Sequence, residues 1–146
     1  MKNSPALLVR LAAASAFLVS GWLKLMQPHE NFLAVIQSFE IVHGPVADLA
    51  SRTLPWAEFT LGMMLFLGLW SRAAAAVLLG FSTLFLGALL SAVLRHLPID
   101  RCGCFGEEVS LPLKQMIAVD CGLWLALAYL ALKPAPFSLD RFLEKT

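Results

Sequence analysis

The stretch AAAAVLLGFSTLFLGALLSAVL at residues 73–94 decides the fold class, because the chain holds no charged residue between Arg72 and Arg95. A helix needs about 20 mostly apolar residues to cross the hydrocarbon core of a bilayer. Only helices and closed barrels satisfy their backbone hydrogen bonds in lipid, and this run is too long and too continuously apolar for a tilted strand. The sequence therefore predicts a membrane-spanning helix over 73–95.

Three further segments, 7–26, 54–70 and 112–132, have the same character. Pro55 lies near the start of the second predicted span, where a helix tolerates proline. The turn that joins the second and third spans is so short that these two helices must form an antiparallel hairpin. We therefore predict an all-α protein, a four-helix transmembrane bundle that forms a single integral membrane domain over 1–146.

The composition supports a membrane protein and excludes several other classes. The chain is 59% hydrophobic and 14% charged, whereas a soluble domain carries about a quarter charged residues. A net charge of +1 gives no electrostatic footprint for nucleic acid, and three cysteines are too few for a disulfide scaffold. The N-terminal apolar stretch continues to Met26, so we expect a retained first helix rather than a cleaved signal peptide.

The loop at 27–53 contains a second kind of helix. Phe32, Val35, Ile36 and Phe39 follow the i, i+3, i+4, i+7 spacing of one helix face, and polar residues occupy most of the other face. This pattern predicts an amphipathic helix in the first outer loop. We expect it to lie on the membrane surface or to pack over the mouth of the bundle.

Small residues recur every four positions on the first span, at Ala12, Ala16 and Ser20. Small residues at this spacing let membrane helices pack closely. Alanine is also an ordinary component of helices, so both interpretations of the stripe stay open.

Three ionisable residues lie inside the predicted spans: Lys24, Glu58 and Asp120. Counted from the inner helix ends at a rise of 1.5 Å per residue, all three lie about 18–21 Å deep. A hydrocarbon core about 30 Å thick places them at one level in its outer third. Two interpretations stay open. One is a functional cluster in which the second carboxyl holds a proton and relays it to a thiol site. The other is a salt bridge that only locks the bundle, with Lys24 snorkelling outward.

The distribution of Lys and Arg predicts the orientation in the membrane. With four spans, one side carries Lys2, Arg10, Arg72, Lys133, Arg141 and Lys145, and the other carries Arg52, Arg95, Arg101 and Lys114. The bias favours both termini in the cytoplasm. The loop that holds Cys102 and Cys104 then faces the oxidising side, where disulfides form and persist.

The string Cys-Gly-Cys-Phe-Gly at 102–106 is the main chemical motif. A Cys-x-Cys pair can close into a small, strained disulfide, and strained, exposed disulfides are the labile ones. Redox exchange by Cys102 and Cys104 is therefore the favoured interpretation, and a purely structural disulfide stays open beside it. Cys121 is a further thiol or, as we expect, a small buried hydrophobe.

Metal binding is a third interpretation of the cysteine pair. Two thiolates suit a soft metal, but a closed zinc site needs four ligands. His96 lies six residues before Cys102, and no spacing of His and Cys in the chain matches a zinc pattern. We therefore expect no metal site.

At these residues the chain resembles the MauE/DoxX-like family of redox-associated membrane proteins, and in particular its MauE branch. The matching elements are Gly21-Trp22-Leu23-Lys24-Leu25 with Pro28 and Phe32, Leu54-Pro55-Trp56-Ala57-Glu58 with Gly62, then Gly68, and Cys102-Gly103-Cys104-Phe105-Gly106. The resemblance covers roughly 10–132. It implies a four-helix membrane protein that helps to mature a disulfide-rich periplasmic protein, typically the small subunit of methylamine dehydrogenase. It also implies a thioredoxin-like partner, with Cys102 and Cys104 as the redox pair.

In architecture alone, the chain also resembles the quinone-linked four-helix proteins that generate disulfides. Their loops carry Cys-x-x-Cys, whereas this loop carries Cys-x-Cys. No cofactor is therefore predicted firmly, and a quinone stays open as the electron acceptor.

Together these features predict a multi-pass thiol–disulfide redox protein of the bacterial inner membrane that supports disulfide formation in a periplasmic client. Cys102 and Cys104 would exchange disulfides, Lys24 would stabilise a thiolate or a bound head group, and Glu58 and Asp120 would handle protons. The expected partners are a thioredoxin-like protein or a disulfide-containing client, and membrane lipid. A homo- or hetero-oligomer stays open. The alternatives are a non-catalytic accessory subunit of a larger membrane complex, with a structural Cys102–Cys104 disulfide, or a small transporter or metal carrier that acts as an oligomer.

Overall fold

The structure is a computed structural model that describes residues 4–99, 101–102 and 111–132. The helices are α1 (Ser4–Met26), α2 (His29–Ser38), α3 (Pro45–Leu67), α4 (Ser71–Leu94) and α5 (Leu113–Leu132). Two very short strands, β1 (Arg101–Cys102) and β2 (Leu111–Pro112), pair antiparallel, and β2 leads directly into α5.

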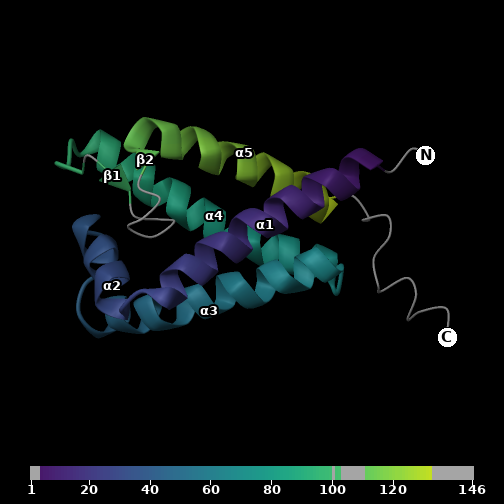
Figure 1. Ribbon diagram of the computed structural model, residues 1–146. Helices are drawn as coiled ribbons and strands as arrows, with labels where there is room; N and C mark the ends of the chain where they lie inside the picture. The colour runs from purple at the N-terminus through teal and green to yellow at the C-terminus, as the bar shows by residue number, and fades with distance from the viewer. Residues whose placement is uncertain (1–3, 100, 103–110, 133–146) are drawn as a thin grey trace.

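The long helices pack as two pairs, α1 with α3 and α4 with α5. Contacts of α3 with α4 and of α1 with α5 hold the two pairs together. The short helix α2 and the β1–β2 ladder lie at one end of the molecule, together with the first residues of α5 (Figure 1). This end is called the α2 end below.

Within the part of the chain that the structure describes, three helices are long and apolar enough to cross a membrane: Pro5–Met26, Ser71–Leu94 and Leu113–Leu132. They correspond to three of the four predicted spans. The all-α prediction is thereby confirmed, together with the membrane character of these helices, but the count of four spans is not confirmed.

Helix α3 differs from the predicted span at 54–70. It begins at Pro45, and Pro55 lies inside it rather than near its start. The prediction failed because the apolar run begins only after Asp48 and Arg52, although these two residues already belong to the helix and form an i, i+4 ion pair. Helix α3 ends at Leu67 because Gly68, its C-cap residue, adopts a left-handed conformation (φ 77°) that ends the helix.

Helix α2 confirms the predicted amphipathic helix. Phe32 is buried, and Phe39, the residue that caps the helix, is also buried. Gln37 and Ser38 on the opposite side are exposed. The apolar face therefore packs towards the bundle, against α3 in particular.

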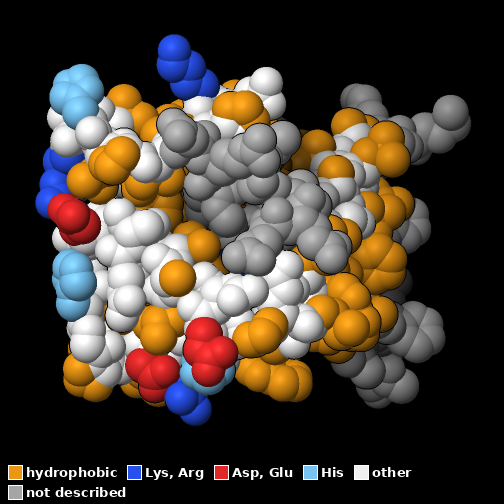
Figure 2. Space-filling view, turned by 60° about the vertical axis from the view of Figure 1, so that its left-hand side comes forward, with side chains coloured by type: hydrophobic (Ala, Val, Ile, Leu, Met, Phe, Trp, Pro, Cys, Tyr) orange, Lys and Arg blue, Asp and Glu red, His pale blue; other side chains and the backbone are white. Residues whose placement is uncertain are grey.

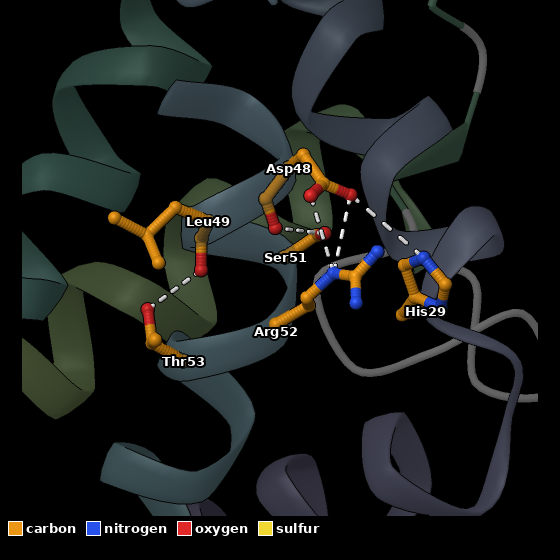
Figure 3. Close-up of polar contacts among 6 residues, drawn as sticks. All are labelled: His29, Asp48, Leu49, Ser51, Arg52 and Thr53. Atoms are coloured by element: carbon orange, nitrogen blue, oxygen red, sulfur yellow. Dashed lines mark hydrogen bonds and ion pairs between the residues drawn. The ribbon is translucent and has the colours of Figure 1, made fainter. Parts of the chain in front are cut away.

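Polar contacts fix both ends of α2. At its start, His29 Nε2 lies 3.8 Å from Asp48 Oδ1, and Arg52 Nε lies 3.2 Å from Asp48 Oδ2 (Figure 3). Just after its last residue, Arg95 Nη2 lies 3.0 Å from Glu40 Oε2, which links the C-terminus of helix α2 to the C-terminus of helix α4. These pairs are partly exposed, so each contributes at most about 1 kcal/mol.

The core has two apolar clusters with polar residues between them. One cluster includes Phe17, Leu65 and Leu78, and the other, nearer the α2 end, includes Leu89 and Met116. The buried polar residues Lys24, Glu58, Ser82 and Asp120 are called the polar layer below. On α4, Ser82 falls between the two clusters in sequence, and on α5 Asp120 does the same.

The outer surface agrees with a membrane protein. Large apolar side chains such as Leu84 (69% exposed) and Leu94 (80% exposed) face outward. Charged and histidine side chains gather towards the α2 end, whereas hydrophobic side chains dominate the part away from it (Figure 2). Trp22 and Trp56 are also exposed, as an interfacial aromatic belt requires.

Candidate functional site in the bundle core

A very close crossing of α1 and α3 positions the first part of the site. A Cβ atom added at Gly21 would lie 2.8 Å from the backbone nitrogen of Phe59 and 3.0 Å from the carbonyl oxygen of Pro55. A Cβ atom added at Gly62 would lie 3.1 Å from the backbone nitrogen of Leu18. Gly21 leaves no room for a side chain because the two backbones approach too closely there, and the contact at Gly62 is tight as well.

The small-residue stripe predicted on the first helix takes only a partial role in this crossing. Ser20 is buried and Ala16 is half-buried, but Ala12 is exposed, so the stripe interpretation is wrong at Ala12. The closest approach is instead made at Gly21 of α1 and Gly62 of α3, which lie on different helices and form no repeat in the sequence. Which small residue faces the partner helix depends on where the two helices cross, and the sequence does not give that point.

The crossing places Lys24 of α1 directly against Glu58 of α3. Lys24 Nζ donates to both Glu58 Oε1 and Oε2, each at 2.9 Å. Ser20 Oγ donates to Glu58 Oε2 at 3.0 Å. The side chains of Lys24 and Glu58 are only 2% and 1% exposed, so Lys24 does not snorkel outward.

Two aromatic rings enclose the ammonium group of Lys24. Its Nζ atom lies 4.7 Å from the ring centroid of Phe32 and 5.0 Å from that of Phe85. Both rings are within the range of a cation–π interaction, which is strongest where water is excluded. The ammonium group is thus committed to Glu58 and to these rings. The role predicted for Lys24, stabilising a thiolate or a bound head group, stays a prediction.

Asp120 of α5 forms the other part of the polar layer. It is 8% exposed, and Ser82 Oγ of α4 donates to its Oδ1 at 3.3 Å. Its second oxygen, Oδ2, is buried and has no hydrogen-bond partner among the described residues. A buried polar atom without a partner is rare in native proteins and requires an explanation.

A small cavity of about 20 Å³ connects the two parts, with Ser20, Lys24, Glu58 and Asp120 among the residues that line it. The three ionisable residues predicted to lie at one level are therefore brought together around one space. The cavity has room for about one water molecule. Their roles in catalysis stay a prediction.

Sequence reasoning missed Ser82 as part of this site. It lies in the longest uncharged run of the chain, where a single serine is typical of an apolar membrane helix and indicates no function. Its signal is weak: a hydroxyl group in a span often bonds to its own backbone, as Thr83 Oγ1 does to the Leu79 carbonyl. Ser82 instead donates across to α5.

The cysteine motif falls mostly outside the described residues. Cys104, Gly103 and Gly106 lie outside them, and for Cys102 only the backbone is described: it sits in β1, paired with Leu111 of β2. This places the backbone of Cys102 next to the start of α5, at the α2 end (Figure 1). Cys121 is exposed on α5, so the expectation of a buried hydrophobe is wrong. The helical turn that buries Asp120 directs the next side chain outward.

A second, larger pocket of about 430 Å³ lies beside the site, between α2, α3 and α4. Its lining is apolar apart from Thr53 and includes Phe32 and Phe39 of α2. Phe85 lines both this pocket and the small cavity. The size and the apolar lining of this pocket suit a lipid-soluble group. The described part of the chain includes no cluster of three or more metal-ligating side chains.

Comparison with known proteins identifies the family. The family model described as "Methylamine utilisation protein MauE" matches residues 2–133, which is most of the chain. No curated protein and no solved structure gave a significant match. The long apolar helices agree with a membrane protein. The chain belongs to the methylamine utilisation protein MauE family of membrane proteins.

Proposed function

We propose that this protein is a membrane thiol–disulfide redox protein that supports disulfide formation or maturation in a periplasmic client through Cys102 and Cys104. The observation that carries the proposal is the cavity lined by Lys24, Glu58 and Asp120. Ionisable groups inside membrane helices are costly and usually mark function. Asp120 lies eight residues after Pro112, so it sits about 12 Å along α5 from the β-ladder that holds Cys102.

The proposed exchange is balanced as follows. A thiolate of the client or of its thioredoxin-like partner attacks the Cys102–Cys104 disulfide, and one cysteine leaves as a thiolate. The second thiolate of the attacking protein, called the partner here, then attacks its own sulfur in this mixed disulfide and releases the other loop cysteine. The partner gains a disulfide, and two electrons and two protons end on Cys102 and Cys104.

The reduced pair then needs an acceptor of two electrons and two protons, and we assign this role to a membrane quinone. The pocket between α2, α3 and α4 supports the assignment, since its apolar lining and volume suit a quinone ring and the start of an isoprenoid chain. Thr53 offers one hydroxyl group there. Ala88→Trp would fill this pocket, and re-oxidation of the pair by a soluble quinone analogue should then fail while the thiol exchange itself persists.

We further propose that α3 is the fourth span. Its hydropathy is lowered by Glu58, but this charge is neutralised by Lys24 inside the bundle. Helix α3 packs along α1, which is itself long and apolar enough to cross a membrane. With four spans, the Lys and Arg bias puts both termini in the cytoplasm of the bacterial cell and the cysteine loop in the periplasm. Labelling of loop cysteines by a membrane-impermeant maleimide in intact cells tests this orientation.

The test of the proposal is reconstitution with a thioredoxin-like partner and a reduced client. Cys102→Ser and Cys104→Ser should each abolish client oxidation, because neither can form the disulfide that accepts the thiolate. Cys121→Ser is the matched control and should keep full activity, since this free thiol lies on α5 and takes no part in the proposed Cys102–Cys104 disulfide. Unchanged oxidation in both loop variants would contradict the proposal and favour an accessory subunit, in which the pair only closes the loop.

A further inference from the structure

The two carboxyl groups of the polar layer have very different hydrogen-bond environments. Glu58 accepts two bonds from the ammonium of Lys24 and one from the hydroxyl of Ser20. Bonds from a cation favour the ionised form of a carboxyl group and are about twice as strong as neutral ones. The ion pair that Glu58 forms with Lys24 carries no net charge.

Asp120 has no such compensation. The one hydrogen bond that it receives from the described residues comes from the neutral hydroxyl of Ser82. The charged groups that face it across the cavity are Lys24 on α1 and Glu58 on α3, and these two already neutralise each other. An ionised Asp120 would place an uncompensated negative charge in the bundle core, which is expensive in a medium of low dielectric constant.

We infer that Asp120 is a proton-binding residue: it carries one exchangeable proton on Oδ2, held next to the Lys24–Glu58 ion pair. The two oxygens of Asp120 take distinct parts. Oδ1 accepts the Ser82 hydrogen bond and is the carbonyl oxygen, while the buried Oδ2 has no partner among the described residues and is free to carry the proton.

The cavity supplies the acceptor that a protonated Oδ2 needs. It has room for about one water molecule, and Asp120 and Glu58 both line it. A carboxylate oxygen has two acceptor sites. Glu58 Oε1 uses one of them for Lys24, so the other remains for a water that accepts a hydrogen bond from Asp120. In this arrangement Asp120 keeps its proton and donates a hydrogen bond to the water, which donates in turn to Glu58, while Glu58 stays paired with Lys24.

This inference rests on the proposed proton-handling role of the polar layer, but it assigns that role to one atom of one residue. Its test reads the protonation state directly and does not need the cysteines to react. Client oxidation can therefore fail while this inference stands, and the reverse also holds.

The experiment is infrared difference spectroscopy of the full-length protein in detergent at neutral pH. The wild-type protein should show a carbonyl band of a protonated carboxylic acid that shifts in heavy water, and Asp120→Asn should remove it. Asp48→Asn is the matched control, since this exposed carboxylate is paired with Arg52 and should leave the band intact.

Ser82→Ala provides a second, independent readout. With its hydroxyl donor removed, the carbonyl of Asp120 should absorb at a higher wavenumber, a shift that a merely structural effect on folding would not produce. A wild-type spectrum without the acid band at neutral pH would overturn the inference. A band that survives Asp120→Asn, or that Ser82→Ala leaves in place unshifted, would overturn it as well.

Discussion

Helices α1 and α3 bury an acidic residue, Glu58, whose two oxygens both accept hydrogen bonds, whereas helices α4 and α5 bury one, Asp120, with an oxygen that has no described partner. The first contact is called the closed interface below, and the second the open interface. Glu58 receives three hydrogen bonds, two of them from a cation, across a crossing so tight that a Cβ atom added at Gly21 would lie 2.8 Å from a backbone nitrogen of α3. Asp120 receives a single bond of 3.3 Å from Ser82 and leaves one oxygen buried without a described partner. Both oxygens of Glu58 thus accept hydrogen bonds, whereas only one oxygen of Asp120 does so within the described part of the chain.

This difference separates a structural role from a chemical one. A fully satisfied ion pair between two closely packed helices resists change, because either partner alone would be left charged and buried. A buried acid with spare hydrogen-bonding capacity can change its protonation state at little structural cost. We therefore propose that the α1–α3 pair acts as the framework of the core and that the α4–α5 pair supplies its proton-binding group.

The largest effect should come from breaking the ion pair on the α1–α3 side. Lys24→Met leaves Glu58 buried and uncompensated, and should lower the free energy of unfolding by about 3–5 kcal/mol. Reversible unfolding in mixed detergent micelles measures this change. The double variant Lys24→Met with Glu58→Met should recover much of the loss, because it removes both charges. A single variant as stable as the wild-type protein would show that the pair is not a framework.

The tight crossing of α1 and α3 gives the second largest effect. Gly21→Ala forces a methyl group to within 2.8 Å of a backbone nitrogen of α3 and should cost about 1–3 kcal/mol of stability. Gly80→Ala on α4 is the matched control, since nothing lies within 4 Å of its added Cβ. Alanine favours helix over glycine, so Gly80→Ala should be neutral or slightly stabilising in the same unfolding measurement. Equal losses in both variants would remove the contrast between the two helix pairs.

The hydrogen bond on the α4–α5 side should matter less. Ser82→Ala removes the donor to Asp120 that the described residues provide, and should cost about 1 kcal/mol in the free energy of unfolding. Thr83→Ala is a useful comparison on the same helix, because that hydroxyl donates to the Leu79 carbonyl of its own helix and accepts a hydrogen bond from Trp124 Nε1, which lies outside the polar layer. A loss with Ser82→Ala as large as that with Lys24→Met would mean that Asp120 is also held in a closed site.

The smallest effect on stability should come from Asp120→Asn. The amide keeps an oxygen for Ser82 and places its NH₂ group in the cavity, so the free energy of unfolding should change by less than about 1 kcal/mol. The same unfolding measurement checks this value. A loss of several kcal/mol would show that Asp120 is ionised and paired with a cation, which would contradict the open interface.

The sequence predicted the polar layer because depth along a helix is a simple function of residue number. Counting 1.5 Å per residue put Lys24, Glu58 and Asp120 at one level, and the structure places all three around one cavity. The long apolar run at 73–95 was likewise close to the observed α4, Ser71–Leu94.

Features that depend on the partner helix could not be predicted in this way. The start of α3 at Pro45 was missed because packing against α2 stabilises turns that are not apolar. The pairing of Lys24 with Glu58 rather than Asp120 follows from the crossing at Gly21, which no periodicity reveals. The redox role of Cys102 and Cys104 stays a prediction, since the loop between β1 and β2 lies outside the described residues.

The most direct test of the proposed function is thiol trapping of Cys102 and Cys104 in intact cells, with Cys121→Ser as the background to remove the other thiol. We predict that the pair is oxidised at rest, that it becomes reduced when a client is overproduced, and that it returns to the disulfide when client synthesis stops. A disulfide that stays closed under client overproduction and resists strong reductant would contradict the account and identify the pair as a structural crosslink.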